Sequence, residues 1–157
     1  ESSYLATVHV TGSPYVQHRG GARGALKVLS PRQIAFADFR GNQQFVSAGN
    51  VATDNRASLI VMDYVHRQRL KLLGDPRFIE LAEADADLVQ QVELPGYRAR
   101  VDRVGLIDVA AFDWNCPQHI TQRFTLDQVE AAARQLHERI AALEQELRAA
   151  RAAAPSR

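Results

Sequence analysis

Cysteine is almost missing from this sequence: Cys116 is the only one among 157 residues. A single cysteine excludes an internal disulfide and any zinc site built on several thiolates. It is typical of a protein kept in a reducing compartment, so we predict a cytoplasmic location. Long hydrophobic runs are missing as well. No apolar stretch approaches the roughly 18 residues that a membrane-spanning helix needs, so we do not expect a membrane protein.

An excess of charge of one sign is also lacking. The 19 basic and 18 acidic residues give a formal net charge of +1, which argues against bulk attraction to nucleic acid. The five histidines never stand at metal-ligand spacing with carboxylates, so no metal site is expected. The sequence contains no G-x-G-x-x-G at a strand–helix junction, no G-x-x-x-x-G-K-S/T and no G-x-S-x-G, which disfavours nucleotide triphosphatases and serine hydrolases.

What the sequence does contain is a series of short runs of alternating or β-branched character. These runs predict strands at residues 4–10, 15–19, 25–29, 34–39, 58–65, 69–74 (continuing past Pro76) and 104–114. The most apolar run, 58–65, predicts a central strand buried on both faces. Residues 42–55 predict a short helix or two turns with a stop at Gly49, and residues 83–92 a short surface helix. Short antiparallel strands at this spacing indicate a mainly β protein, a barrel of about six strands.

The C-terminal segment has a different pattern. Thr125 and Gln128 have the spacing of a capping box at the start of a helix. Apolar residues then recur at alternating steps of three and four: Leu126, Val129, Ala133, Leu136, Ile140, Leu143, Leu147 and Ala150. This stripe is typical of a coiled coil, although an amphipathic helix lying on its own barrel would also produce it. We therefore predict two parts, a barrel domain at 1–124 and a helix at 125–157.

Polar residues suited to an anionic ligand gather in four places. In residues 15–29, three cations surround three glycines, which fits either a surface turn or an anion pocket. Residues 37–50 offer an arginine beside amides that precede a helical turn. Residues 66–71 and 113–124 add further basic, amide and indole side chains. Each cluster alone fits a solvated surface, but four separate clusters favour a binding site.

Five separated motifs in this sequence carry a resemblance: YLATV to QHRGG (4–21), FADFRGN (36–42), LIVMDY (59–64), RLKLLG (69–74) and DWNCPQHI (113–120). Residues 3–124 resemble the pyridoxamine 5′-phosphate oxidase-related family of FMN-binding split barrels, in particular a branch with QHRGG and DWNCPQHI. The resemblance implies a six-stranded antiparallel split barrel of Greek-key type. It also implies a homodimer that holds two FMN molecules at its subunit interface.

The resemblance and the basic clusters together nominate the residues that bind FMN. The strand bearing Gln17 would follow the isoalloxazine edge, Arg19 and Lys27 would balance the phosphate, and the segment from Trp114 would close the site from the partner subunit. The full set is Gln17, His18, Arg19, Gly20, Lys27, Asp38, Phe39, Arg40, Gly41, Asn42, Gln44, Ser47, Arg69, Trp114, Gln118 and Arg123.

Two departures from the family bear on its activity. The oxidases carry an R-x-V-L-L-K strand where Gln17–Gly21 stands here, and their C-terminal R-x-H motif has no counterpart, so oxidation of vitamin B6 is not expected. We predict an FMN-dependent oxidoreductase acting on an unidentified small molecule. The alternatives are a flavin-binding or carrier module without turnover, a split barrel that binds haem or a deazaflavin, and a structural dimer organised by the C-terminal helix.

Overall fold

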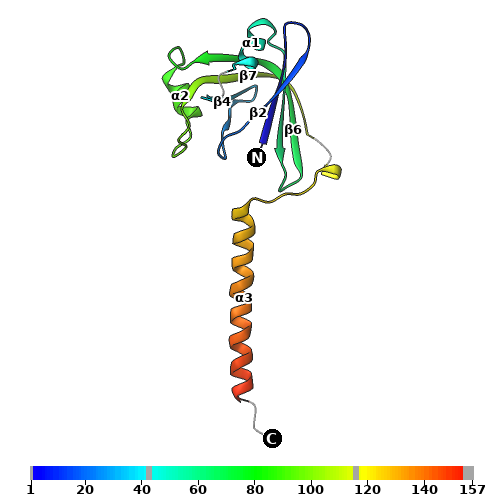
Figure 1. The fold of residues 1–157 in the computed structure, drawn as a ribbon, viewed down its shortest axis with the longest axis vertical. Helices are drawn as coiled ribbons and strands as arrows, with labels where there is room; N and C mark the ends of the chain where they lie inside the picture. Colours follow the sequence, from blue (N-terminus) through cyan, green and yellow to red (C-terminus); the bar gives the residue numbers. More distant parts are fainter. Residues whose placement is uncertain (1, 42–43, 115–116, 154–157) are drawn as a thin grey trace. The chain divides into compact units, whose positions relative to one another are not determined.

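The structure is a computed structural model that describes residues 2–41, 44–114 and 117–153 (Figure 1). The chain divides into two compact units, residues 1–121 and 122–157, which are described separately. The strands are β1 (Ser2–Val8), β2 (Pro14–Arg19), β3 (Leu26–Ser30), β4 (Gln33–Phe39), β5 (Ala57–Asp63), β6 (Gln68–Glu80) and β7 (Val101–Trp114). The helices are α1 (Val46–Thr53), α2 (Ala86–Val92), the short 3₁₀ helix η1 (Pro117–His119) and α3 (Leu126–Ala153).

The strands form one antiparallel sheet in the order β2-β1-β5-β6-β7-β4-β3. The mainly β class is confirmed. The expected number of six strands is wrong, because each of the seven alternating runs pairs as a strand of its own. The sheet is also not closed: β2 and β3 are edge strands, and no ladder joins them in the part of the chain that the structure describes.

Strand β6 continues through Pro76, as predicted. Proline has no backbone N–H and is tolerated where a strand has a neighbour on one side only. The β5 partner ends where Ala57 pairs with Gly74, so Pro76 pairs only with Ile107 of β7. Gly74 is required at this point because a Cβ there would lie 2.3 Å from the carbonyl oxygen of Asp108.

The core lies on both faces of β4. Its Ile34 and Phe36 pack in one cluster with Leu5, Leu59, Leu72 and Ile107, and Ala35 and Ala37 pack in a second with Val92, Val104 and Leu106. The second cluster exists because α2 covers this part of the sheet. The expectation of a doubly buried strand at 58–65 is therefore wrong: in β5 only Leu59 is buried, because α2 packs over β3 and β4 instead.

Helix α1 runs through Gly49 to Thr53, and the backbone N–H of its C-cap residue Asp54 donates to the Asn50 carbonyl at 2.8 Å. The predicted stop at Gly49 is wrong. This glycine does not adopt the left-handed conformation that ends helices. The Asn50 side chain donates to Thr7 Oγ1 at 3.0 Å, and both residues are buried. This bond anchors α1 on β1.

The other predicted helix, at 83–92, is confirmed as α2, with Asp85 accepting from the Asp87 N–H.

Helix α3 begins with the predicted capping box. The Thr125 backbone N–H donates to Gln128 Oε1 at 2.9 Å, and the Gln128 N–H donates to Thr125 Oγ1 at 3.3 Å.

No helix in the described part of the chain combines the length and apolar character that crossing a membrane requires. Within residues 2–41, 44–114 and 117–153, no three His, Cys, Asp or Glu side chains lie together as a metal site would need.

The turn that follows α1 gives a test of this geometry. Arg56 donates to the Asp54 carboxylate, which lowers the pKa of Asp54 from 3.8 to about 2. A carboxyl whose pKa is lower in the folded than in the unfolded protein stabilises the fold at pH values above its unfolded pKa. This stabilisation is lost as the pH falls through the pKa of the folded protein. We expect Arg56→Ala to raise the pKa of Asp54 toward 3.8, measured by NMR titration. It should also flatten the loss of stability between about pH 4 and pH 2. Arg77→Ala, which removes a different paired arginine, should leave the Asp54 titration unchanged.

Candidate functional site

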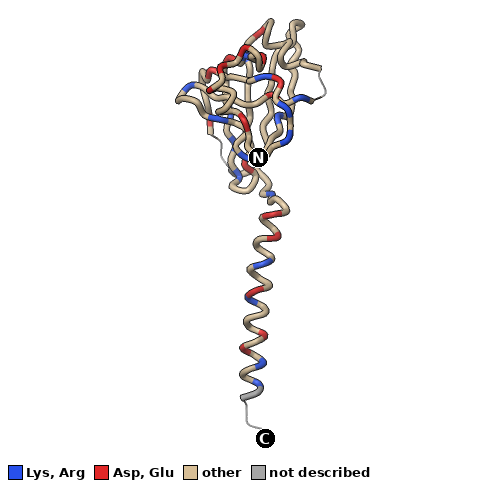
Figure 2. Tube along the Cα trace, turned by 90° about the vertical axis from the view of Figure 1, so that its left-hand side faces the viewer, with Lys and Arg blue, Asp and Glu red and all other residues tan. Residues whose placement is uncertain are grey.

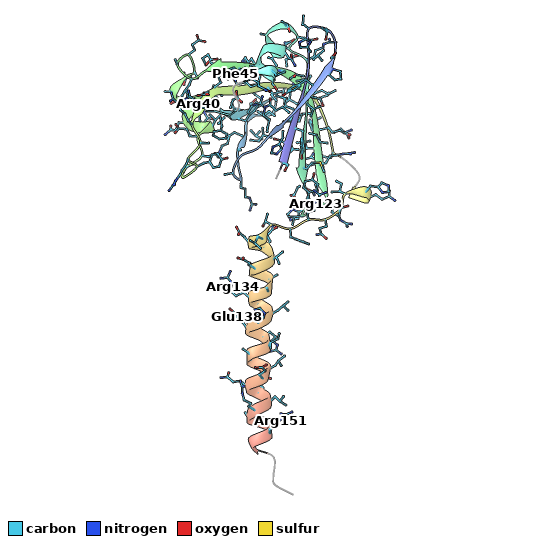
Figure 3. The ribbon with its side chains drawn as sticks, in the orientation of Figure 1. Arg40, Phe45, Arg123, Arg134, Glu138 and Arg151 are labelled. Carbon is cyan, nitrogen blue, oxygen red and sulfur yellow. The ribbon has the colours of Figure 1, made fainter. Side chains whose placement is uncertain are left out.

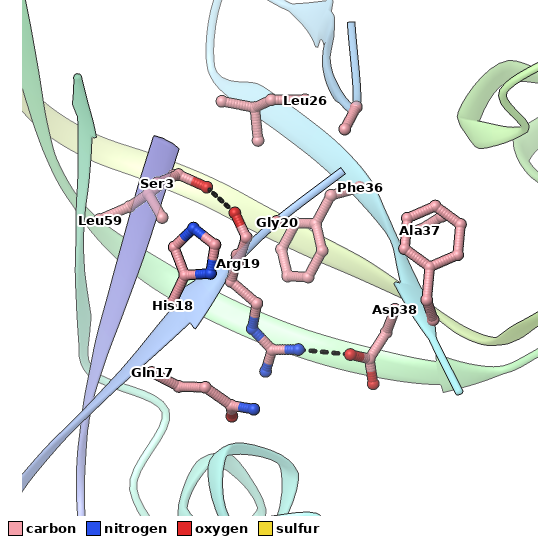
Figure 4. A pocket seen from close by; sticks show the side chains of 12 residues that line it. Ser3, Gln17, His18, Arg19, Gly20, Leu26, Phe36, Ala37, Asp38 and Leu59 are labelled. Atoms are coloured by element: carbon pink, nitrogen blue, oxygen red, sulfur yellow. Dashed lines mark hydrogen bonds and ion pairs between the residues drawn. The ribbon is translucent and has the colours of Figure 1, made fainter. Parts of the chain in front are cut away.

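The candidate site lies where edge strand β2 faces β4, a region called here the open seam (Gln17–Arg19 of β2 and Phe36–Phe39 of β4). Gln17 and Arg19 point to the interior because they pair with Leu5 and Ser3 of β1, and Leu5 is fully buried. The Arg19 side chain reaches across the open seam to Asp38 (Figure 4). The Arg19 carbonyl accepts from Ser3 Oγ at 2.9 Å. A side-chain ion pair thus joins two strands that no backbone ladder connects.

Asp38 is the centre of a buried ionic cluster. It is 6% exposed and accepts from Arg19 Nη1 at one oxygen. Its other oxygen accepts from Arg103 Nε at 3.0 Å and Arg103 Nη2 at 2.7 Å. Arg103 of β7 lies directly opposite Asp38 in the ladder. Two guanidinium groups share this carboxylate, and Arg103 Nη1 also lies 3.9 Å from Oε1 of the exposed Glu80. Asp38 is therefore the buried counter-charge for two cations in a place largely removed from water.

Aromatic rings enclose both guanidinium groups. The Arg19 guanidinium carbon lies 5.5 Å from the ring centre of Phe36 and 5.4 Å from that of Phe78. The Arg103 carbon lies 4.4 Å from the ring centre of Phe45 and 5.5 Å from that of Phe78. These contacts stabilise the two cations, whose side chains are only 16% and 12% exposed. Arg19 Nε is buried there without a hydrogen-bond partner, which leaves one charged N–H donor unsatisfied.

Two cavities flank Arg19 and share Gln17, Arg19, Asp38 and Phe39 in their walls. The first, of about 150 Å³, is largely apolar, with Leu26, Phe36 and Leu59 in its wall. The second, of about 270 Å³, is more polar and includes Gly41, Ser47 and Arg103. Ser47 Oγ donates to Gln17 Oε1 at 2.8 Å, so the amide nitrogen is the end of Gln17 that a ligand can meet. The two cavities together offer an apolar compartment beside a cationic one.

The backbone of Phe45, a residue in the wall of the second cavity, has an unfavourable conformation. Its φ is +52°, in the left-handed region, which costs a residue with a side chain roughly 1–2 kcal/mol. Phe45 precedes the first turn of α1, and its ring covers Arg103. Strained backbone that places a particular side chain is common at binding sites. This conformation therefore marks the second cavity as a candidate site.

The structure brings half of the nominated residues to the open seam. Those lining one or both cavities are Gln17, His18, Arg19, Gly20, Asp38, Phe39, Gly41 and Ser47. His18 is on the opposite face of β2 from Arg19, and its ring centre lies 5.3 Å from that of Tyr4.

The other nominated residues lie elsewhere. Arg40 Nε donates to Asp102 at 3.2 Å. The remaining ones do not line these two cavities: Lys27 in β3, Gln44 before α1, Arg69 in β6, Trp114 at the end of β7 and Gln118 in η1. Arg123 belongs to the second unit, and Asn42 is outside the described residues. Flavin binding by any nominated residue stays a prediction.

The basic and glycine-rich segment 15–29 contains both a turn and part of a site. Gly24 has φ +82° and belongs to a turn, and a Cβ on Gly21 would lie 2.6 Å from the Ala25 Cβ. Glycine is therefore required at both positions by the local backbone conformation and packing. Arg19 alone among the three cations lines the two cavities, and Asp38 neutralises part of its charge.

Sequence reasoning missed Arg103, Phe45 and Phe78. Arg103 stands 65 positions from Asp38, and only the β4–β7 register makes them cross-strand neighbours. The available signal was weak: Arg103 shares the alternation of β7 with Gly105 and the buried Ile107, and an arginine on an inward face needs an acidic partner. Phe78 follows Pro76 in the predicted extension of β6, but nothing local indicates that two guanidinium groups lie on its ring.

No protein-family model matches the sequence, and no curated protein matches it. Solved structures do share the fold. HupZ of Group A Streptococcus is 14% identical with a TM-score of 0.56, and the alignment covers 78% of this chain and 90% of HupZ. A Clostridium acetobutylicum protein of the pyridoxinephosphate oxidase family, related to general stress protein 26, is 11% identical with a TM-score of 0.51, covering 82% and 87%. An FMN-binding protein of Syntrophomonas wolfei is 10% identical with a TM-score of 0.51, covering 73% and 76%.

These structures define the class of protein by its fold. The described sheet shares its fold with a protein of the pyridoxinephosphate oxidase family and with an FMN-binding protein, so the resemblance seen in the motifs is supported at the level of the fold. Its sheet is open between β2 and β3, and its candidate site lies beside that opening.

The ionic cluster can be tested by removing its central charge. Asp38→Asn removes the carboxylate that two largely buried guanidinium groups share and leaves only the exposed Glu80 near Arg103, which we expect to lower the free energy of unfolding by about 3–5 kcal/mol. The matched control is Asp102→Asn, which breaks the more exposed pair with Arg40 and should cost no more than about 1 kcal/mol. Urea unfolding of both variants measures the difference. Equal losses in the two variants would contradict the buried cluster.

Proposed function

We propose that the chain is a flavoprotein that binds FMN in the open seam and uses it for oxidation and reduction of a small molecule. The observation that carries the proposal is the Arg19–Asp38–Arg103 cluster, whose two guanidinium groups border an apolar and a polar cavity. The shared fold of the Syntrophomonas wolfei FMN-binding protein and the Clostridium acetobutylicum protein supports it.

The described residues fit this cofactor. A phosphate monoester carries nearly two negative charges near pH 7, and Arg103 lines the polar cavity while Arg19 holds an unsatisfied N–H donor. Each charge-assisted hydrogen bond contributes about 1.5–3 kcal/mol. The apolar wall of the first cavity suits a flat aromatic ring. Bound FMN would supply the redox chemistry, while Gln17 and Arg19 would hold and orient it.

The proposal includes a homodimer whose interface completes the site. Phe112 and Trp114 pair with Leu72 and Leu70, so they share the face of the sheet that carries the core, yet they are 66% and 59% exposed. Large apolar residues left open on a core face favour a covering partner. Both cavities are also smaller than the roughly 300–1,000 Å³ of typical ligand pockets. A second copy that covers this face would enlarge and close the site.

Binding is tested by titrating the purified chain with FMN and following flavin fluorescence and absorption. We expect micromolar or tighter binding, with one FMN per chain. Arg103→Gln should weaken it by roughly 10- to 100-fold, because it removes a charge-assisted contact. Arg77→Gln is the matched control: this arginine pairs with Asp108 and is half exposed, so its loss should leave FMN affinity unchanged. An unchanged flavin spectrum after FMN is added to the wild-type chain would overturn the proposal, and tighter binding of haem or a deazaflavin would replace the ligand.

Turnover needs a separate measurement. FMN bound by the wild-type chain should be reduced by NADH or NADPH and reoxidised by an acceptor, followed by the loss and return of flavin absorption. Bound FMN that resists both donors across a panel of acceptors would instead indicate a flavin carrier or sensor.

A further inference from the structure

Helix α3 exposes a continuous apolar stripe. Six of its large apolar side chains are between 45% and 71% exposed: Leu126, Val129, Leu136, Ile140, Leu143 and Leu147. The helix has 28 residues, which corresponds to about 42 Å of length. Helices in proteins depend on packing of their apolar face for most of their stability. The stripe therefore calls for a partner along most of the helix.

The positions in the stripe match a two-stranded coiled coil. In heptad notation, the a positions are Leu126, Ala133, Ile140 and Leu147, and the d positions are Val129, Leu136, Leu143 and Ala150. Two apolar residues per heptad form the narrow face that another helix covers, whereas a helix packed on a sheet usually shows a wider face. A β-branched residue at a beside leucines at d, as at Ile140 with Leu136 and Leu143, favours two strands.

The charges beside the stripe indicate a second copy of the same chain in parallel orientation. In a parallel, in-register pair, each g residue faces the e residue five positions later in the other helix. Arg139 would then face the partner's Glu144, and Glu146 would face the partner's Arg151, each twice by symmetry. An antiparallel pair that buries the same stripe would place Arg139 near the partner's Arg139 and Glu130 near the partner's Glu144. Charge complementarity therefore favours the parallel arrangement.

Two of these charges, Arg139 and Glu146, have no opposite charge within reach on their own helix. Figure 2 shows acidic and basic residues interspersed along α3, and some can pair within it: Arg134 and Glu138, four positions apart, project from the same side (Figure 3). By contrast, the residues three and four positions from Arg139 are Gln135, Leu136, Ala142 and Leu143. Those around Glu146 are Ala142, Leu143, Ala149 and Ala150. Arg139 and Glu146 thus lack opposite charges at the spacings that stabilise one helix.

We propose that α3 binds α3 of a second copy of this chain as a parallel, in-register, two-stranded coiled coil. The apolar stripe of each α3 thus packs against the same stripe of the other chain. This contact does not involve the open seam or a flavin, so it can succeed or fail independently of FMN binding.

Cysteine cross-linking of the full-length chain tests the contact directly. Ala133→Cys places a thiol at an a position, next to its counterpart in a parallel pair, and Ala131→Cys, the matched control, places one on the outer f position. With a short bismaleimide, we expect most of the Ala133→Cys chains to become covalent dimers. The Ala131→Cys chains should match the wild-type chain, which reports any reaction of Cys116. An equal, low yield from both variants would overturn the proposal and favour a helix packed on its own barrel.

A mixed experiment fixes the orientation. The antiparallel pairing of this stripe places position 133 opposite position 143, so chains with Ala133→Cys mixed with chains carrying Leu143→Cys would cross-link better than either alone. In the parallel pair, each variant cross-links to itself, and the mixture adds nothing. Preferential mixed dimers would contradict the parallel arrangement.

Charge reversal provides an independent readout. In the Ala133→Cys chain, the further change Arg139→Glu places a carboxylate opposite the partner's Glu144, so the dimer yield at low salt and low protein concentration should fall at least threefold. The loss should shrink in 1 M NaCl, where the Debye length is only about 3 Å. Arg134→Glu is a strict control, because it disturbs the Glu138 neighbour within the helix but faces no partner residue. Equal losses from both reversals would contradict the proposed pairing.

Discussion

The buried carboxylate of Asp38 is the constraint on which the rest of this barrel depends. The sheet ends in two strands that no ladder joins, so its edges need another connection where they approach. Arg19 of edge strand β2 provides it by binding Asp38 of β4, which Arg103 of the neighbouring β7 also binds. Such charges are costly to remove from water unless they are paired. Phe36, which lies beneath Arg19, packs where it does because Gly105 has no side chain: a Cβ there would lie 2.3 Å from the ring.

The elements that carry the site are held by packing on both sides. Strand β4 presents Phe36 and Asp38 to the barrel interior while Ala35 and Ala37 pack under α2. Helix α1 is held by the buried hydrogen bond between Asn50 and Thr7, which positions Ser47 against Gln17. A site supported in this way keeps its donors in place before a ligand arrives, so binding costs less ordering entropy. The strained backbone of Phe45 belongs to the same arrangement.

Local patterns in the sequence predicted most of the elements, and the errors share one cause. Alternation located the strands, and Thr125 with Gln128 located the start of α3, because both signals depend on neighbours within a few residues. The apolar run at 58–65 was expected to be buried on both faces, yet hydrophobicity does not say which face a helix covers, and α2 packs over β4 instead. Gly49 was expected to end a helix whose bonds continue past it. The strand count of about six came from the spacing of the runs as well as from the resemblance, although the sequence contains seven runs.

By itself, the sequence determined the mainly β class, the glycine-dependent turn after Arg19, the capped C-terminal helix and the residue types suited to an anionic ligand. Only the tertiary structure decided which of those residues meet. Asp38 and Arg103 become neighbours through the register of β4 with β7, and Arg19 joins them because the fold of the sheet brings β2 opposite β4. Register and curvature arise from pairing between distant segments, and such pairing leaves no mark on the few residues around each position.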